Sequence, residues 1–165
     1  MAAITEIAPR FIATAHRIVW ATVATVTADG APRTRILHPI WEFDGSTLSG
    51  WIATDPSSPK ANDLAARPEI SLTYWDATHD TCTADCTVVW ETADDERIAA
   101  WKRFASAPEP VGYDPAIVPG WTDPTAASFG VVRLAPTALR VMPGSLMLRG
   151  EGAVMTWRSD AQRSR

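Results

Sequence analysis

A short stretch after a predicted strand combines the residue types that bind phosphate groups. Ser58 and Pro59 are typical of the first positions of a helix, where backbone amides have no partner inside the helix. Lys60 follows in the first turn, where the helix dipole disfavours a cation unless an anion accompanies it. A phosphate group would satisfy these amides, the lysine and the hydroxyls of Thr54 and Ser57 together. The alternative interpretation is an ordinary helix cap beside a solvated lysine.

Two arginines precede this stretch on a predicted strand. Arg33 and Arg35 are two residues apart, so on a strand their side chains point to the same face. Two guanidinium groups on one face are unfavourable unless an anion lies between them. The alternative is a solvent-facing edge strand that uses charge against aggregation, but Leu37 and Trp41 share the same face. We therefore predict an anion site formed by the arginines and the loop.

The order and spacing of these features resemble the FMN-binding core of the pyridoxamine 5'-phosphate oxidase superfamily. The resemblance covers residues 18–91 and is looser beyond them. It implies a split β-barrel that binds FMN at the interface of a homodimer. It also implies that the arginine-bearing strand runs along the flavin while the loop holds the phosphate. The candidate cofactor-binding residues are Arg33, Arg35, Ile36, Leu37, His38, Thr54, Ser57, Ser58 and Lys60.

The C-terminal part departs from the oxidases of that superfamily, which grip their substrate with an Arg-x-His pair. Residues 135–158 contain no histidine, so we do not expect oxidation of pyridoxamine phosphate. The resemblance is instead to reductases and stress proteins that use FMN or a deazaflavin. We expect an oxidoreductase that passes a hydride through flavin N5 to a small planar acceptor. The alternatives are a deazaflavin-dependent reductase on the same fold and a non-enzymatic flavin or haem carrier or stress sensor.

No residue stands out as a catalytic acid or base, and a few others admit two interpretations. His38 is either a proton donor near the flavin ring or a polar strand residue beside a proline. Tyr113 and Trp121 lie in the proline-rich segment 107–124. They either stack on a flat substrate or anchor this segment to the core.

The cysteines do not predict a metal site or a disulfide. His79, Cys82 and Cys86 lie close in sequence, but their spacing is not that of a zinc finger. On a strand, the histidine points to the opposite face from both cysteines. The two cysteines are then about 13 Å apart, too far for a disulfide. We therefore expect no metal and two reduced thiols.

The predicted elements make a mainly β domain in which short helices lie outside an antiparallel split barrel of six to seven strands. β-Branched runs and turn signals predict strands at 18–27, 33–43, 47–53, 69–75, 82–91, 129–134 and 139–141. Helices are predicted at 6–15, 60–66 and 92–104. Nothing divides the chain, so we expect one domain over residues 1–165 with a core at about 18–141.

The composition of the chain excludes some classes of binding partner. The chain has 165 residues, of which 46% are hydrophobic, and a net charge of −4, so no basic surface invites nucleic acid or an anionic membrane. No apolar run approaches the roughly 20 residues that span a bilayer. Glu6, Pro9 and Arg10 interrupt the start of the chain, which is unlike a secretory signal. We expect a cytoplasmic protein whose partners are a second copy and a small molecule.

Overall fold

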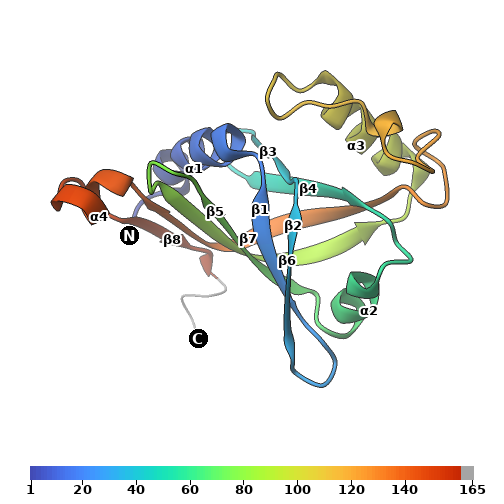
Figure 1. Cartoon of the computed structure of the whole chain (residues 1–165), viewed down its shortest axis with the longest axis horizontal. Helices are drawn as coiled ribbons and strands as arrows, with labels where there is room; N and C mark the ends of the chain where they lie inside the picture. The colour runs from blue at the N-terminus through green and yellow to red at the C-terminus, as the bar shows by residue number, and fades with distance from the viewer. Residues whose placement is uncertain (161–165) are drawn as a thin grey trace.

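The computed structural model describes residues 1–160, which form one antiparallel sheet with helices around it (Figure 1). The strands are β1 (Ala21–Val26), β2 (Pro32–Leu37), β3 (Ile40–Phe43), β4 (Leu48–Thr54), β5 (Glu69–Trp75), β6 (Thr81–Glu91), β7 (Gly130–Met142) and β8 (Met155–Arg158). The helices are α1 (Ile4–Ile18), α2 (Pro59–Ala66), α3 (Asp94–Ser106), the short 3-10 helix η1 (Pro115–Ile117) and α4 (Gly144–Arg149).

The strand order is β2-β1-β5-β6-β7-β4-β3, with β8 paired to β7. The sheet curls on itself. This is evident from one small interior cavity, which is lined by side chains from β1, β2, β4, β5 and β7. Figure 1 shows α4 and β8 at one end of the molecule and α2 and α3 toward the other. The mainly β, antiparallel architecture is as predicted, with β8 as one strand more than expected.

Alternating side chains account for the core. In β5, every second residue is buried, which is the pattern of a strand with one face inward. The main cluster lies under α1 and includes Phe11, Trp41 and Tyr74. The indole nitrogen of Trp41 donates a hydrogen bond to the Tyr74 hydroxyl at 2.8 Å, so this aromatic pair is buried without an unsatisfied donor.

Two predicted boundaries are wrong for reasons that involve proline. The strand predicted at 33–43 is two strands, because the chain turns at His38 and Pro39 between β2 and β3. Conversely, the strands predicted at 129–134 and 139–141 form the single strand β7. Pro136 is accommodated by a bulge, since Asp85 pairs with Ala138 and the next residue of β6 pairs with Pro136.

Three further predictions concern α1, the cysteines and the proline-rich segment. α1 runs from Ile4 to Ile18, so the helix predicted at 6–15 is longer than expected at both ends. Cys82 and Cys86 are free and buried, as expected. The segment 107–124 contains η1 and packs against α3 and the sheet. None of the helices within residues 1–160 is long and apolar enough to cross a membrane.

Candidate functional site

The loop between β4 and α2 has the geometry of a polar cradle. Thr54 ends β4 and is buried, and Ser58 occupies the N-cap position of α2. The Ser58 hydroxyl does not cap the helix; it donates to the Asp55 carbonyl at 2.6 Å. The Asp55 carboxylate accepts from the Ser57 amide and hydroxyl, each at 2.7 Å. The first turn of α2 therefore begins without a side-chain cap.

Lys60 points into this cradle. Its ammonium donates to the Thr54 hydroxyl at 2.5 Å and to the Ser58 hydroxyl at 2.7 Å. Burial lowers the pKa of Lys60, the nearby Arg35 lowers it further, and Asp55 opposes both effects. Among the ion pairs of the described residues, none includes Lys60. Within residues 1–160, the half-buried Lys60 ammonium thus donates its hydrogen bonds to two uncharged hydroxyls.

Arg35 and Arg33 have different surroundings, although both belong to β2. Arg35 is partly buried, donates to the Thr25 hydroxyl at 2.9 Å and pairs with Asp63 at 3.4 Å. Arg33 is exposed and lies near Asp29, whose pKa it helps to lower. Arg35 lines the small interior cavity together with Lys60. The structure therefore brings one of the two predicted arginines beside the lysine.

An uncharged cavity of about 370 Å³ adjoins this cationic end. It is lined by Val19, Trp20, Ile36, Leu37, His38, Ala53, Pro110, Gly112, Tyr113, Ile117, Val118 and Trp121. Leu37 lines both this cavity and the small interior one. Ala53 precedes Thr54 on β4, so the two sites share the ends of the same strands. We call the larger space the ring cavity.

Tyr113 and Trp121 both line the ring cavity and also anchor their segment. Trp121 is buried and packs edge-on against Phe129, with ring centroids 5.1 Å apart. Tyr113 packs against Phe104 at 5.3 Å, and burial raises its pKa to about 12. Tyr113 and Trp121 thus anchor segment 107–124 to the core, which was one interpretation, and they also lie where the other interpretation, stacking on a flat substrate, would need them. Contact with a substrate stays a prediction.

His38 lies in the wall of the ring cavity with its imidazole between two aromatic rings. Its ring centroid is 5.2 Å from that of Trp20 and 5.0 Å from that of Tyr113. Burial lowers the pKa of His38 and so favours the neutral imidazole, while a backbone hydrogen bond with Val111 opposes this shift. Its Nε2 atom is buried and has no hydrogen-bond partner within the described structure. A buried polar atom of this kind is unfavourable unless a ligand or water satisfies it.

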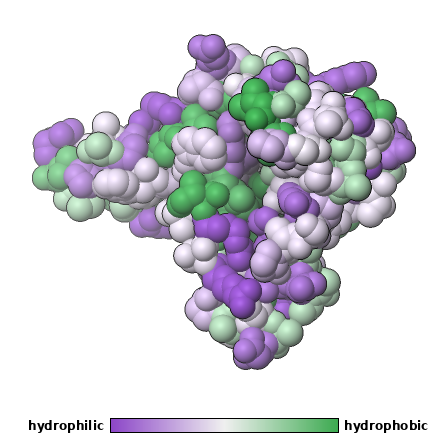
Figure 2. All heavy atoms as spheres, turned by 45° about the vertical axis from the view of Figure 1, so that its right-hand side comes forward, coloured by the Kyte–Doolittle hydropathy of each residue, from purple (hydrophilic) through white to green (hydrophobic). Residues whose placement is uncertain are grey.

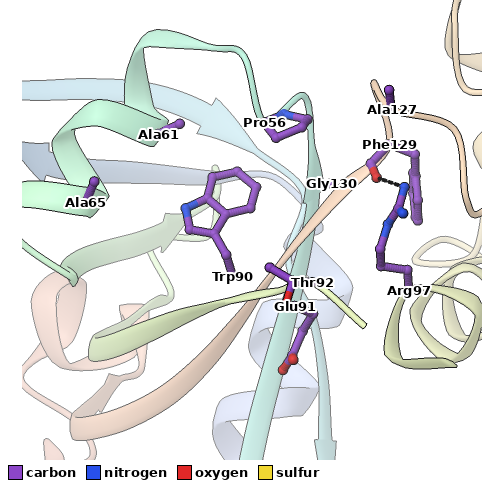
Figure 3. Close-up of a pocket in the computed structure, with 10 residues that line it drawn as sticks. All are labelled: Pro56, Ala61, Ala65, Trp90, Glu91, Thr92, Arg97, Ala127, Phe129 and Gly130. Carbon is purple, nitrogen blue, oxygen red and sulfur yellow. Dashed lines mark hydrogen bonds between the residues drawn. The ribbon is translucent and has the colours of Figure 1, made fainter. Parts of the chain in front are cut away.

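A second pocket, of about 430 Å³, lies behind the cradle (Figure 3). Trp90 lies between Pro56 of the loop and the alanines of α2 in this view. Gly130 makes this approach possible. A Cβ there would lie 2.8 Å from the Thr54 carbonyl oxygen, 2.9 Å from the Trp90 ring and 3.0 Å from Pro56 Cδ. The start of β7 therefore supports the loop from behind.

Sequence reasoning missed two polar residues of the site. Thr25 belongs to a β-branched strand and Asp63 to a short helix, and neither is next to the predicted motif. Their contact with Arg35 depends on the packing of α2 against β1. The sequence offers only one signal, an acidic residue three positions after Lys60. As for a metal site, no group of three or more His, Cys, Asp or Glu residues in the described part of the chain could hold an ion.

Several solved structures share the fold. A crystal structure from Clostridium acetobutylicum, of a protein related to general stress protein 26, is 11% identical with 96% of each chain covered and a TM-score of 0.67. A pyridoxamine 5'-phosphate oxidase-related, FMN binding protein from Nostoc punctiforme is 18% identical, covering 97% of this chain and 98% of its own, with a TM-score of 0.65. An F420 reductase is 17% identical, covering 77% of this chain and 93% of its own, at 0.56. These similarities confirm the predicted split barrel.

A comparison of the sequence with models of protein families identifies the family. No curated protein matches the chain. The sequence model of the pyridoxamine 5'-phosphate oxidase family matches residues 10–142, which span β1 to β7 and include the cradle and the ring cavity. This match covers most of the chain and agrees with the resemblance found from the arginine-bearing strand and the loop. The chain therefore belongs to the pyridoxamine 5'-phosphate oxidase family.

Proposed function

We propose that this protein binds FMN and works as a flavin-dependent oxidoreductase with a small planar acceptor. The observation that carries the proposal is the position of an uncharged cavity directly beside a cationic, hydroxyl-rich cradle. A ligand that fits both must have a flat apolar part joined to an anionic end. FMN has this form, and when bound it supplies hydride transfer through ring atom N5.

The cradle fits a phosphate group. Lys60, Thr54 and Ser58 supply an ammonium and two hydroxyls within hydrogen-bond distance of one another. The start of α2 has no side-chain cap, and the positive end of its helix dipole lies at the cradle. Arg35 lies on the same cavity and adds a second cation. Lys60 lacks an ion-pair partner among the described residues, which is the state expected of a cation whose partner is a ligand.

The ring cavity fits a flat ring system. Its lining is aliphatic or aromatic apart from His38 and the Tyr113 hydroxyl, and it contains no charged side chain. The neutral imidazole would offer its unpartnered Nε2 to a polar edge of the ring or of the acceptor. Apolar walls exclude water from the ring face, and the backbone of β2 supplies hydrogen-bonding groups along it.

Family membership and the FMN binding relative from Nostoc punctiforme support this cofactor. The deazaflavin alternative is supported by the similarity to an F420 reductase. A deazaflavin with a longer anionic tail would extend from the cradle toward Arg33, which is exposed at the start of β2. We place FMN first because the cradle needs only one phosphate group to satisfy its donors.

Titration of FMN into the purified protein tests the proposal, with quenching of flavin fluorescence as the readout. Saturable binding with one FMN per chain is expected, and an absorbance scan distinguishes flavin from haem. A parallel titration with the deazaflavin identifies the better ligand. Failure of both flavins to bind would remove the proposed function.

A paired assay then tests the reaction. The FMN-loaded protein is expected to reduce menadione when reduced flavin is supplied and to leave pyridoxamine phosphate unchanged. The described C-terminal residues after β7 contain no histidine, so nothing in the form of an Arg-x-His pair orients the amine substrate. Poor positioning alone lowers rates by about a hundredfold or more. Rapid formation of pyridoxal phosphate would contradict the assignment. If the FMN-loaded protein converts neither compound, a carrier or sensor is favoured.

A further inference from the structure

Asp63 is a buried carboxylate inside a site that is proposed to bind an anion. Its relative exposure is 4%, and it lies on α2 one turn after Lys60. A buried charge is unfavourable by several kcal/mol unless it is paired and hydrogen-bonded. A carboxylate near a phosphate also repels it. The proposed function gives Asp63 no role, so its position needs a separate explanation.

The contacts of Asp63 form a closed set with two residues from neighbouring strands. Its Oδ2 atom accepts from the Thr25 hydroxyl at 2.7 Å and from Arg35 Nη2 at 3.4 Å. Arg35 Nη1 donates to the same Thr25 hydroxyl at 2.9 Å. The three residues come from β1, β2 and α2, so the set joins the helix that carries Lys60 to the strand that carries the arginine.

These contacts leave Arg35 able to bind an anion. A guanidinium has five N–H donors in a fixed plane, and Thr25 and Asp63 each take one. Arg35 and Lys60 both line the small interior cavity next to Thr54. The plane of the guanidinium is therefore fixed beside the ammonium, with donors to spare.

We propose that Asp63 is a positioning residue, which acts with Thr25 to hold the Arg35 guanidinium beside Lys60 so that both cations meet one phosphate group. The proposal rests on the proposed binding of FMN. It differs from a purely electrostatic role, in which Asp63 only offsets the charge of Arg35. In that case removal of the carboxylate charge would strengthen anion binding, whereas loss of positioning weakens it.

Thr25→Val is the cleanest test, because it removes the shared hydroxyl and changes no charge. We expect FMN affinity to fall about tenfold, the effect of losing one oriented charge-assisted hydrogen bond. Thr25→Ser keeps the hydroxyl and should restore wild-type affinity. Thr156→Val, at an exposed threonine of β8 outside the site, is the matched control and should bind FMN like the wild type.

A double-mutant comparison separates positioning from general loss of structure. In an Arg35→Met background, Thr25→Val should have no further effect on FMN affinity, because the residue it positions is gone. A Thr25→Val effect that persists there would overturn the proposal. Tighter FMN binding in Asp63→Asn would also overturn it, since that result indicates a purely electrostatic role.

The reactivity of Lys60 gives a readout that needs no flavin. The chain has two lysines, Lys60 and Lys102, and Lys102 is exposed on α3. Arg35 lowers the pKa of Lys60, so release of Arg35 in Thr25→Val should slow acylation of Lys60 several-fold relative to Lys102, as measured by peptide mass spectrometry. If the wild type binds no flavin, the proposed function fails while this measurement still tests the positioning. Wild-type reactivity of Lys60 in Thr25→Val would overturn it.

Discussion

The surroundings of Lys60 disfavour its positive charge. We therefore expect anion binding to depend on Lys60 more than on any other residue of the cradle. Burial and Arg35 both work against the ammonium, and the groups that it contacts directly are hydroxyls. A neutral hydroxyl satisfies hydrogen bonds but does not balance charge. A bound phosphate would do both.

Replacing Lys60 by alanine should therefore weaken FMN binding. Loss of a charge-assisted hydrogen bond is worth about 1.5–3 kcal/mol, or roughly a tenfold to hundredfold rise in Kd. Flavin fluorescence titration measures the change, and Lys102→Ala on α3 is the control, since that lysine lies outside the site. Wild-type affinity in Lys60→Ala would show that the phosphate is held elsewhere.

The same residue predicts a pH dependence. The ammonium is the form that binds phosphate, and the pKa of Lys60 is lowered from 10.5 by burial and Arg35, with Asp55 opposing. FMN affinity should therefore fall as pH rises through this lowered pKa. In Lys60→Arg the side chain stays charged, so its decline should begin at higher pH. Superimposable pH profiles for the two proteins would contradict the assignment.

At the scale of elements, β7 determines the position of the loop that forms the cradle. Gly130 pairs with Thr54 across the β4–β7 ladder, and the space that a side chain would need is filled by the loop and Trp90. Figure 3 shows Gly130, Trp90 and Pro56 together around the pocket next to this loop. The shape of the phosphate site is thus set by a strand some seventy residues further along the sequence.

Gly130→Ala should displace the loop and weaken FMN binding, with a loss of stability of about 1–3 kcal/mol from overpacking. Gly50→Ala is the matched control. Its Cβ would lie 2.7 Å from the Trp41 ring in the core, so it should lower the melting temperature without touching the cradle. Calorimetry and FMN titration on both variants separate the two effects. Equal losses of FMN affinity would show that general destabilisation is responsible.

The elements that follow from local pattern were predicted well, and those that depend on distant contacts were not. The strand predicted at 69–75 has the observed bounds of β5, and 82–91 differs from β6 by one residue, because alternating burial is visible in the sequence. β8 is four residues long and is defined by its pairing with β7. Such a short strand has no pattern of its own.

The residues of the candidate site also fall into those that local sequence predicts and those that depend on distant contacts. Thr54, Ser58 and Lys60 are close in sequence, so their residue types and spacing were enough to predict that they lie together. Thr25 and Asp63 meet only because α2 packs back on β1. The unequal exposure of the two predicted arginines also depends on this packing. A single sequence contains no local signal for it.

At the scale of the whole molecule, one outer face of the sheet is suited to packing against a second copy. Thr22 pairs with Ile36 of β2 and with Thr73 of β5, and all three side chains are exposed. The next row contains Thr34, Ala24 and Ser71, so two rows across three strands carry no charge. Ile36 is 59% exposed and also lines the ring cavity, so this face is continuous with the site. Surface hydrophobic side chains also occur in several separate patches in the view of Figure 2.

We predict that the protein is a homodimer that uses this face and that its flavin site is completed by the second subunit. Light scattering should give twice the chain mass of 17.9 kDa. Thr73→Arg places a charge in the centre of the face without disturbing a buried side chain, and it should give monomers that bind FMN more weakly. Thr156→Arg, exposed on β8, is the control and should remain dimeric. A wild-type mass of one chain at micromolar concentration would contradict the dimer. A dimeric Thr73→Arg variant with unchanged FMN affinity would place the contact on another surface.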